Sequence, residues 1–169
     1  ETVELPSDAV VLPGFIDPHI HGAGGADAMD GSEEALATIS RTLAEEGTTS
    51  FLATTMTESP AAILRALRAV RDCGELPGAR LLGVHLEGPF IAPAYAGAQP
   101  KEYIAEPTVA AFDAYMAASG GGIRIVTVAP EVPGADDLIR HLAGLGIVAS
   151  VGHSAAGVGD APLRAARAV

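Results

Sequence analysis

The sequence predicts an α/β fold built on a parallel β-sheet, because five short apolar runs alternate with four amphipathic segments. The apolar runs are nearly continuous, which is typical of strands that are buried on both faces. Five such units fit either an open doubly wound sheet or part of a (β/α)8 barrel. The 169 residues, of which 49% are hydrophobic, are enough for one domain with a buried core.

The expected strands follow one another at regular intervals. A dinucleotide-binding loop is not expected after the first of them, because residues 22–25 are Gly-Ala-Gly-Gly and lead into an acidic loop instead of a helix. The five strands are expected at 10–17, 49–55, 80–87, 123–130 and 146–153.

The segments between these strands have the signals of amphipathic helices. Segment 33–46 places Leu36, Ile39 and Leu43 on one face and is followed by Gly47, a typical helix-ending residue. Ser59 and Pro60 predict the N-cap and first residue of the next helix. The remaining two helices are expected over 108–118 and 135–145, the latter ending at Gly146.

Composition excludes several classes of partner. Ten Lys and Arg against 21 Asp and Glu give a net charge of −11, which disfavours both nucleic acid and anionic membranes. Cys73 is the only cysteine, so the fold needs no disulfide and no oxidising compartment. The first ten residues lack signal-peptide features, and no apolar run approaches the ~18 residues of a membrane span. We therefore expect a soluble, cytoplasmic protein.

Polar side chains gather where the first, third and fifth expected strands end. Four of the five histidines lie there, together with one glutamate: His19, His21, His85, Glu87 and His153. In barrel enzymes the reacting groups lie at this carboxyl-terminal edge of the sheet and come from several strands. These residues are therefore the candidates for chemistry.

The types of side chain at this edge indicate a metal site. His19 and His21 are two residues apart on an extended segment, so both point to the same face. With Glu87 and His153 they would form a nitrogen- and oxygen-rich site of the kind that zinc or iron accepts. A hydrolase would leave one position open for an activated water.

Three other polar residues receive different expectations. For His85 we favour a supporting hydrogen bond over direct ligation of a metal. His141 lies near the end of an expected helix and is assigned no chemistry. Glu131, after the fourth strand, is expected to be a loop or capping acid.

The same residues carry a family resemblance. Segment 13–22, Pro-Gly-Phe-Ile-Asp-Pro-His-Ile-His-Gly, resembles the first-strand signature of the amidohydrolase superfamily. Within it the chain resembles the N-acetylglucosamine-6-phosphate deacetylase family, from Val10 onward. The motifs that carry this resemblance are His-Leu-Glu-Gly-Pro-Phe (85–90), Gly-Ala-Gln-Pro (97–100), Val-Ala-Pro-Glu (128–131) and Gly-His-Ser-Ala (152–155).

The resemblance implies a function and roles for particular residues. Glu87 and His153 would bind a divalent metal, while His19 and His21 would serve a second metal position, so one or two zinc or iron ions are expected. Ala98 and Gln99 would lie in the loop that contacts the sugar. The implied reaction is hydrolysis of the acetamide of N-acetylglucosamine 6-phosphate, and the full-length protein would be a homodimer.

The resemblance also implies that residues 1–169 are an incomplete barrel domain. Proteins of this family begin with strands of a β-sandwich and continue beyond the position of Val169 into a further histidine motif and a general-base aspartate. About five of eight β/α units would be present, without the β-sandwich and the last barrel units. No catalytic residue is then expected in this chain, and the isolated chain should be inactive.

Alternative functions remain open from the sequence. Another amidohydrolase-superfamily amidase or deacetylase is the nearest one. Members whose metals are bridged by a carboxylated lysine do not fit, because the only lysine, Lys101, lies in a Pro-Lys-Glu loop away from any expected strand end. A non-catalytic scaffold with the same fold is the alternative from a different class.

Overall fold

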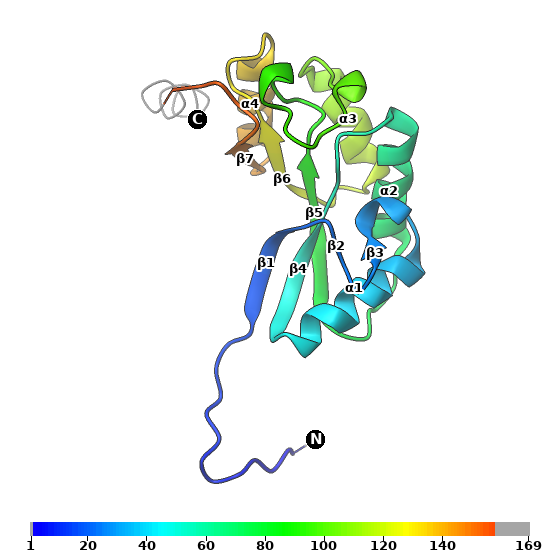
Figure 1. The fold of residues 1–169 in the computed structure, drawn as a ribbon, viewed down its shortest axis with the longest axis vertical. Coiled ribbons are helices and arrows are strands. Elements are labelled where there is room, and N and C mark those ends of the chain that lie inside the picture. The colour runs from blue at the N-terminus through cyan, green and yellow to red at the C-terminus, as the bar shows by residue number, and fades with distance from the viewer. Residues whose placement is uncertain (1, 158–169) are drawn as a thin grey trace.

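A five-stranded parallel sheet forms the centre of the computed structural model, which describes residues 2–157 (Figure 1). The strand order is β1-β4-β5-β6-β7, so each main strand pairs with the next one in the chain. This sequential order is that of a barrel, because a doubly wound sheet reverses its strand order. The strands are β1 (Phe15–Ile20), β4 (Thr48–Thr54), β5 (Arg80–Glu87), β6 (Ile123–Val128) and β7 (Val148–Val151).

Four helices connect these strands, and Figure 1 shows α1, α2 and α3 along one side of the sheet. The predicted N-cap is confirmed, since the Ser59 hydroxyl accepts a hydrogen bond from the Ala62 N–H at 3.3 Å and Pro60 begins the helix. The helices are α1 (Glu33–Glu45), α2 (Pro60–Asp72), α3 (Val109–Ala118) and α4 (Ala135–Gly144), with short 3-10 helices η1 (Ala28–Asp30), η2 (Pro93–Tyr95) and η3 (Lys101–Tyr103).

The core lies between the helices and the sheet in two clusters. In the larger one, α2, α3 and α4 pack on β5 and β6, with Ile63, Phe112 and Leu138 fully buried. In the smaller one, Leu36 and Ile39 of α1 pack with Phe51 of β4, as the helical pattern predicted. Complete burial of such a side chain stabilises the fold by roughly 1.5–3 kcal/mol.

The first strand differs from its expected range. Residues 10–14 lie outside any helix or strand, and β1 starts at Phe15, which pairs with Thr48. The predicted range followed the apolar run, but residues 10–14 are exposed and have no neighbouring strand in the described structure. At its other end the strand runs past the expected residue 17 to Ile20, which places His19 within it.

The start of the β1–α1 connection contains a small hairpin that the sequence did not predict. Here β2 (Gly22–Ala23) pairs antiparallel with β3 (Ala26–Asp27), in a stretch expected to be a loop. It follows His21 directly and leads into η1.

Both outer strands of the sheet have exposed apolar residues. Phe15 and Ile16 of β1 are 73% and 65% exposed, and Val148 of β7 is 58% exposed. This is the exposure expected of a curled sheet whose two edges are unpaired in the described residues. None of the described helices is long and apolar enough to cross a membrane.

Candidate metal centre

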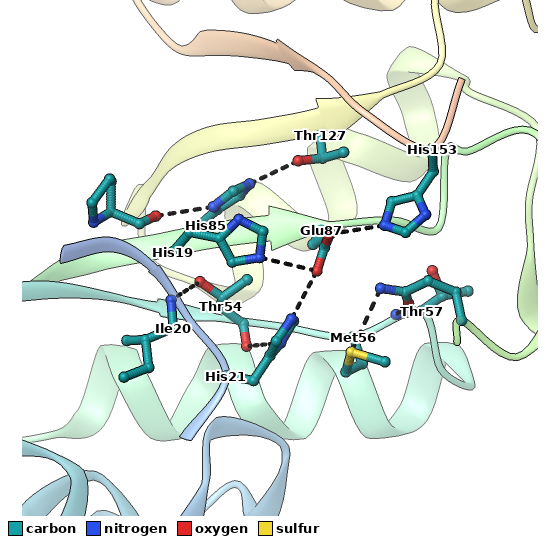
Figure 2. Close-up of polar contacts among 12 residues, drawn as sticks. His19, Ile20, His21, Thr54, Met56, Thr57, His85, Glu87, Thr127 and His153 are labelled. Carbon is teal, nitrogen blue, oxygen red and sulfur yellow. Dashed lines mark hydrogen bonds and ion pairs between the residues drawn. The ribbon is translucent and has the colours of Figure 1, made fainter. Parts of the chain in front are cut away.

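The carboxyl-terminal edge of the sheet brings three histidines onto one carboxylate (Figure 2). Glu87 ends β5 and lies between the residues from β1 and those from the β7 loop. His19 Nε2 and His21 Nε2 lie 3.4 and 2.9 Å from Glu87 Oε2. His153 Nε2 lies 3.0 Å from the other oxygen, Oε1. All four predicted metal-binding residues are therefore neighbours in the structure.

The surroundings of Glu87 keep it ionised. Its side chain is only 8% exposed, and this burial alone would raise its pKa. The close contacts with His21 and His153, together with the nearby His19, outweigh burial and lower the pKa of Glu87 to about 2. In turn, the contact with Glu87 raises the pKa of His21 against the opposing effect of burial.

Main-chain carbonyls orient two of the imidazoles. His21 Nδ1 lies 3.2 Å from the Thr54 carbonyl oxygen, and His153 Nδ1 lies 3.0 Å from that of Tyr95. A carbonyl oxygen only accepts, so in each ring Nδ1 carries the hydrogen. When Nε2 carries no hydrogen, its lone pair is available to a cation. This is the arrangement in which proteins present imidazole to a metal.

His153 takes up an unusual backbone conformation to reach the site. Its φ of 48° lies in the left-handed region, which costs a non-glycine residue roughly 1–2 kcal/mol. The main chain of His153 is also held from the loop after β5, because the Ala92 N–H donates to the His153 carbonyl at 3.0 Å. Contacts elsewhere in the loop therefore have to stabilise this turn.

His85 lies beneath the site and makes hydrogen bonds, as expected. It is 3% exposed, its Nδ1 is 3.0 Å from the Pro18 carbonyl oxygen, and its Nε2 is 2.8 Å from the Thr127 hydroxyl. Burial lowers its pKa despite the opposing contact with Pro18, so the ring is neutral and Thr127 donates to Nε2. Both ring nitrogens are occupied, and His85 links β1, which carries His19, to β6.

The donor atoms fit a divalent metal ion. His19, His21 and Glu87 each offer one atom, all within 4.8 Å of one another. Glu87 Oε2 is buried and receives no aligned hydrogen bond from the described residues, although two imidazoles lie beside it. Ligand atoms about 2.0–2.1 Å from a tetrahedral zinc ion are about 3.3 Å apart. The observed distances of 2.9 and 3.4 Å are close to this value.

The loop expected to contact a sugar presents its two residues differently. Ala98 is exposed, whereas Gln99 is 5% exposed. The Thr57 N–H donates to Gln99 Oε1 at 2.6 Å, and Gln99 Nε2 donates to the Met56 sulfur at 3.5 Å. Both ends of the Gln99 amide therefore contact the segment after β4. Figure 2 shows the contact of this amide with the Met56 sulfur.

Two further residues from the sequence analysis lie outside this cluster. His141 of α4 lies 2.8 Å from Asp113 of α3 and packs edge-on against Phe112. Lys101 is exposed in η3, so no lysine among the described residues reaches the metal-binding group.

Several supporting residues were missed from the sequence. Thr54 and Tyr95 act through carbonyl oxygens, which every residue type has, so no sequence signal marks them. The Thr54 hydroxyl also accepts from the Ile20 N–H at 2.9 Å. Thr127 could have been found, because it immediately precedes the Val-Ala-Pro-Glu motif and is opposite Glu87 in the β5–β6 pairing.

Residues 10–162 match the amidohydrolase family over nearly the whole chain. The chain belongs to this family. Amidohydrolases are generally metal-dependent, which agrees with the His-His-Glu group at the edge of the sheet. The parallel, curled sheet is accordingly part of the (β/α)8 barrel of an amidohydrolase.

Several amidohydrolases of known name are similar to the chain. N-acetylglucosamine-6-phosphate deacetylase of Bacillus subtilis is 50% identical over 157 residues, covering 90% of this chain and 40% of the relative. N-acetylgalactosamine-6-phosphate deacetylase of Escherichia coli O157:H7 is 40% identical over 152 residues, covering 88% and 40%. The chain thus spans about two fifths of the length of these curated relatives.

A solved amidohydrolase structure has the same fold over most of the chain. It is a mutant N-acetyl-D-glucosamine-6-phosphate deacetylase from Mycobacterium smegmatis in complex with N-acetyl-D-glucosamine-6-phosphate. The TM-score is 0.77 at 28% identity, with 92% of this chain and 42% of the other chain covered.

Proposed function

We propose that the chain supplies the metal-binding part of a deacetylase that hydrolyses the acetamide of N-acetylglucosamine 6-phosphate. The products would be glucosamine 6-phosphate and acetate. The names of the similar proteins support this substrate, and one of them is known in complex with that sugar phosphate. The proposed enzyme is a metal-dependent amide hydrolase, and the nitrogen and oxygen donors of the site suit that class.

The observation that carries this proposal is the position of Glu87 between histidines from two directions. One oxygen faces His19 and His21, and the other faces His153. Glu87 and His153 would hold one metal position, and His19 and His21 a second. The ions would be zinc or iron, and a carboxylate with two separately engaged oxygens suits either one or two of them.

Within this arrangement the chain's residues bind and orient. A bound cation would lower the pKa of a water molecule and polarise the acetyl carbonyl oxygen. The Thr54 and Tyr95 carbonyls hold the Nδ1 hydrogens of His21 and His153, so their Nε2 atoms remain available. His85 holds the Pro18 carbonyl and thereby the backbone that leads into His19.

Glu87 is unsuited to carry the proton of the attacking water. With a pKa of about 2, it is fully ionised near neutral pH and a weak base. In line with the family resemblance, we place the general-base aspartate outside these 169 residues, within the remaining barrel units of the full-length protein. Without that residue the isolated chain should release no acetate.

The substrate would lie against the loop after β5. We assign Ala98 and Gln99 to the contact with the sugar. The buried Gln99 amide would act by fixing the loop on Met56 and Thr57, while the exposed Ala98 would face the ligand. We further propose that the full-length protein is a cytoplasmic homodimer. We expect no nucleic-acid or membrane partner, because residues 1–169 carry a net charge of −11.

The test is acetate release by the full-length, metal-loaded protein. N-acetylglucosamine 6-phosphate should be hydrolysed, and both removal of metal and Glu87→Gln should abolish the reaction. N-acetylgalactosamine 6-phosphate is the second candidate substrate, because a relative with that name is 40% identical. Failure to release acetate from either sugar phosphate would overturn the proposal. Acetate release by residues 1–169 alone would overturn the placement of the general base.

A further inference from the structure

Glu131 lies at the edge of the sheet that carries the metal centre, yet the proposed chemistry does not use it. It follows β6 in the Val-Ala-Pro-Glu motif, next to the loop that carries His153. It is not the N-cap of α4, because that position is Gly134, which has no side-chain hydrogen bond. The carboxylate instead faces the chain after β7.

Two donors from the His153 loop bind this carboxylate. The Ser154 hydroxyl donates to Glu131 Oε2 at 2.7 Å, and the Ala155 N–H donates to Oε1 at 2.5 Å. Ser154 Oγ accepts in turn from the Ala156 N–H at 2.9 Å. Both carboxylate oxygens thus hold the residues that immediately follow His153. Hydrogen bonds to a charged acceptor are stronger than those between neutral groups.

These bonds stabilise a turn that does not form easily. His153 has a φ of 48°, so the direction of its side chain depends on a backbone conformation that L-residues rarely adopt. The Ala92 N–H holds the His153 carbonyl, and the Tyr95 carbonyl holds Nδ1. On the following residues, the Glu131 carboxylate holds both the Ser154 hydroxyl and the Ala155 N–H.

We propose that Glu131 is a positioning residue that fixes the turn after β7, so that His153 presents Nε2 to Glu87. The inference rests on the proposed function, because His153 has to bind metal for its position to matter. Residues that orient a metal ligand typically change metal affinity 10- to 100-fold when they are removed. Glu131 would act through the main chain of its neighbour and not by contact with the metal.

The experiment measures Co²⁺ affinity and the Co²⁺ absorption spectrum of the full-length protein. Glu131→Ala should weaken Co²⁺ binding by about 10- to 100-fold and alter the spectrum. Glu131→Gln keeps one acceptor oxygen but turns an N–H toward a donor, so its loss should be smaller. Ser154→Ala removes one of the two bonds and should also give an intermediate loss. Asp113→Asn is the matched control, because Asp113 contacts His141 on another part of the fold.

A second measurement uses no metal at all. In the metal-free protein, the imidazole ¹⁵N shifts of His153 should change in Glu131→Ala and remain unchanged in Asp113→Asn. If Glu131→Ala does not fold, Glu131→Gln and Ser154→Ala decide the question by the same two measurements.

The outcomes separate this inference from the proposed function. If His153→Ala weakens Co²⁺ binding but the Glu131 and Ser154 variants bind normally, the positioning role is wrong and the proposed function stands. A loss of thermal stability in these variants with unchanged affinity and spectrum would also overturn the inference. If His153→Ala binds Co²⁺ normally, the metal site assigned to His153 fails, and the role of Glu131 fails with it.

Discussion

Glu87 Oε2 and His21 Nε2 lie 2.9 Å apart, although they come from opposite sides of β4 and are far apart in the sequence. Three imidazoles lie beside Glu87: His19 and His21 face Oε2, and His153 contacts Oε1. The carboxylate is therefore the central group of the site. Removing it should have larger effects than removing any one histidine.

Glu87→Gln should abolish tight metal binding while preserving the fold. The amide has nearly the same shape but no charge, so the histidines keep their neighbours and the cation loses its anionic ligand. We expect affinity to fall by at least about 100-fold, as measured by elemental analysis after dialysis. Glu102→Gln, an exposed glutamate in η3, should bind metal as the wild type does. Unchanged stoichiometry in Glu87→Gln would rule out this site.

The pH dependence of stability should reverse when metal is added. Without metal, the raised pKa of His21 contributes stability that is fully present below its ordinary value of 6.5 and is lost as pH rises through the folded value. Glu87, at about 2 against 4.5, contributes stability above pH 4.5 that is lost as pH falls toward 2. Metal binding instead strengthens as pH rises, because the ligands must be deprotonated.

Urea unfolding of wild type and His21→Gln, at about pH 5.5 and about pH 8, tests this reversal. In chelator, the substitution should destabilise the protein more at the lower pH. With saturating Zn²⁺, it should destabilise it more at the higher pH. His141→Gln, which removes a partly buried imidazole paired with Asp113 away from the site, is the control. The same pH trend with and without metal would contradict the expectation.

Thr127→Val should destabilise the protein through His85. The substitution removes the hydroxyl that donates to Nε2 and leaves a buried ring nitrogen without a partner. The expected loss is about 1–3 kcal/mol in the free energy of unfolding. Thr49→Val removes an exposed hydroxyl from β4 and should cost much less. Equal losses in the two variants would mean that His85 does not depend on Thr127.

Gly88→Ala should be strongly destabilising because of Thr57. A Cβ at Gly88 would lie 2.0 Å from Thr57 Oγ1, and φ at this residue is +70°. We expect a loss of roughly 3 kcal/mol or more from steric overlap and the left-handed conformation together. Gly25→Ala separates the two effects, because it has φ +83° with open space around its Cβ.

Thr57→Ala should restore part of the stability lost in Gly88→Ala. The Thr57 hydroxyl is buried without a hydrogen-bond partner among the described residues, so its removal alone should cost little. Differential scanning calorimetry of the single and double variants gives the coupling directly. Additive losses would contradict the overlap that the structure shows.

Much of the fold could be predicted from the sequence, because its signals are local. The apolar run 80–87 coincides with β5, and the Ser59-Pro60 signal coincides with the start of α2. The first strand was predicted too early, since apolar character alone does not reveal where a neighbouring strand begins to pair. Whether the units form a barrel or a doubly wound sheet depends on strand order, which local patterns do not carry.

The site, like the fold, could be predicted from the sequence only in part. The histidines and Glu87 were predicted to converge because parallel strands end at one edge, and they do lie together. The left-handed turn at His153 and the burial of Gln99 could not be predicted. Both depend on contacts between loops whose paths the sequence does not define locally.

The histidines and Glu87 of the site come from β1, β5 and the chain that follows β1 and β7, while β4 and β6 carry none of them. Adjacent strands are about 4.8 Å apart, so the side chains from β1 and β5 have to meet across β4. There β4 ends in Thr54, and β6 pairs Thr127 with Glu87. A long side chain at Thr54 would displace the Ile20 N–H that its hydroxyl holds, and one at Thr127 would press on His85. The strands that supply no ligand, β4 and β6, are therefore restricted in the size of these side chains, just as β1 and β5 are restricted in the chemistry of theirs.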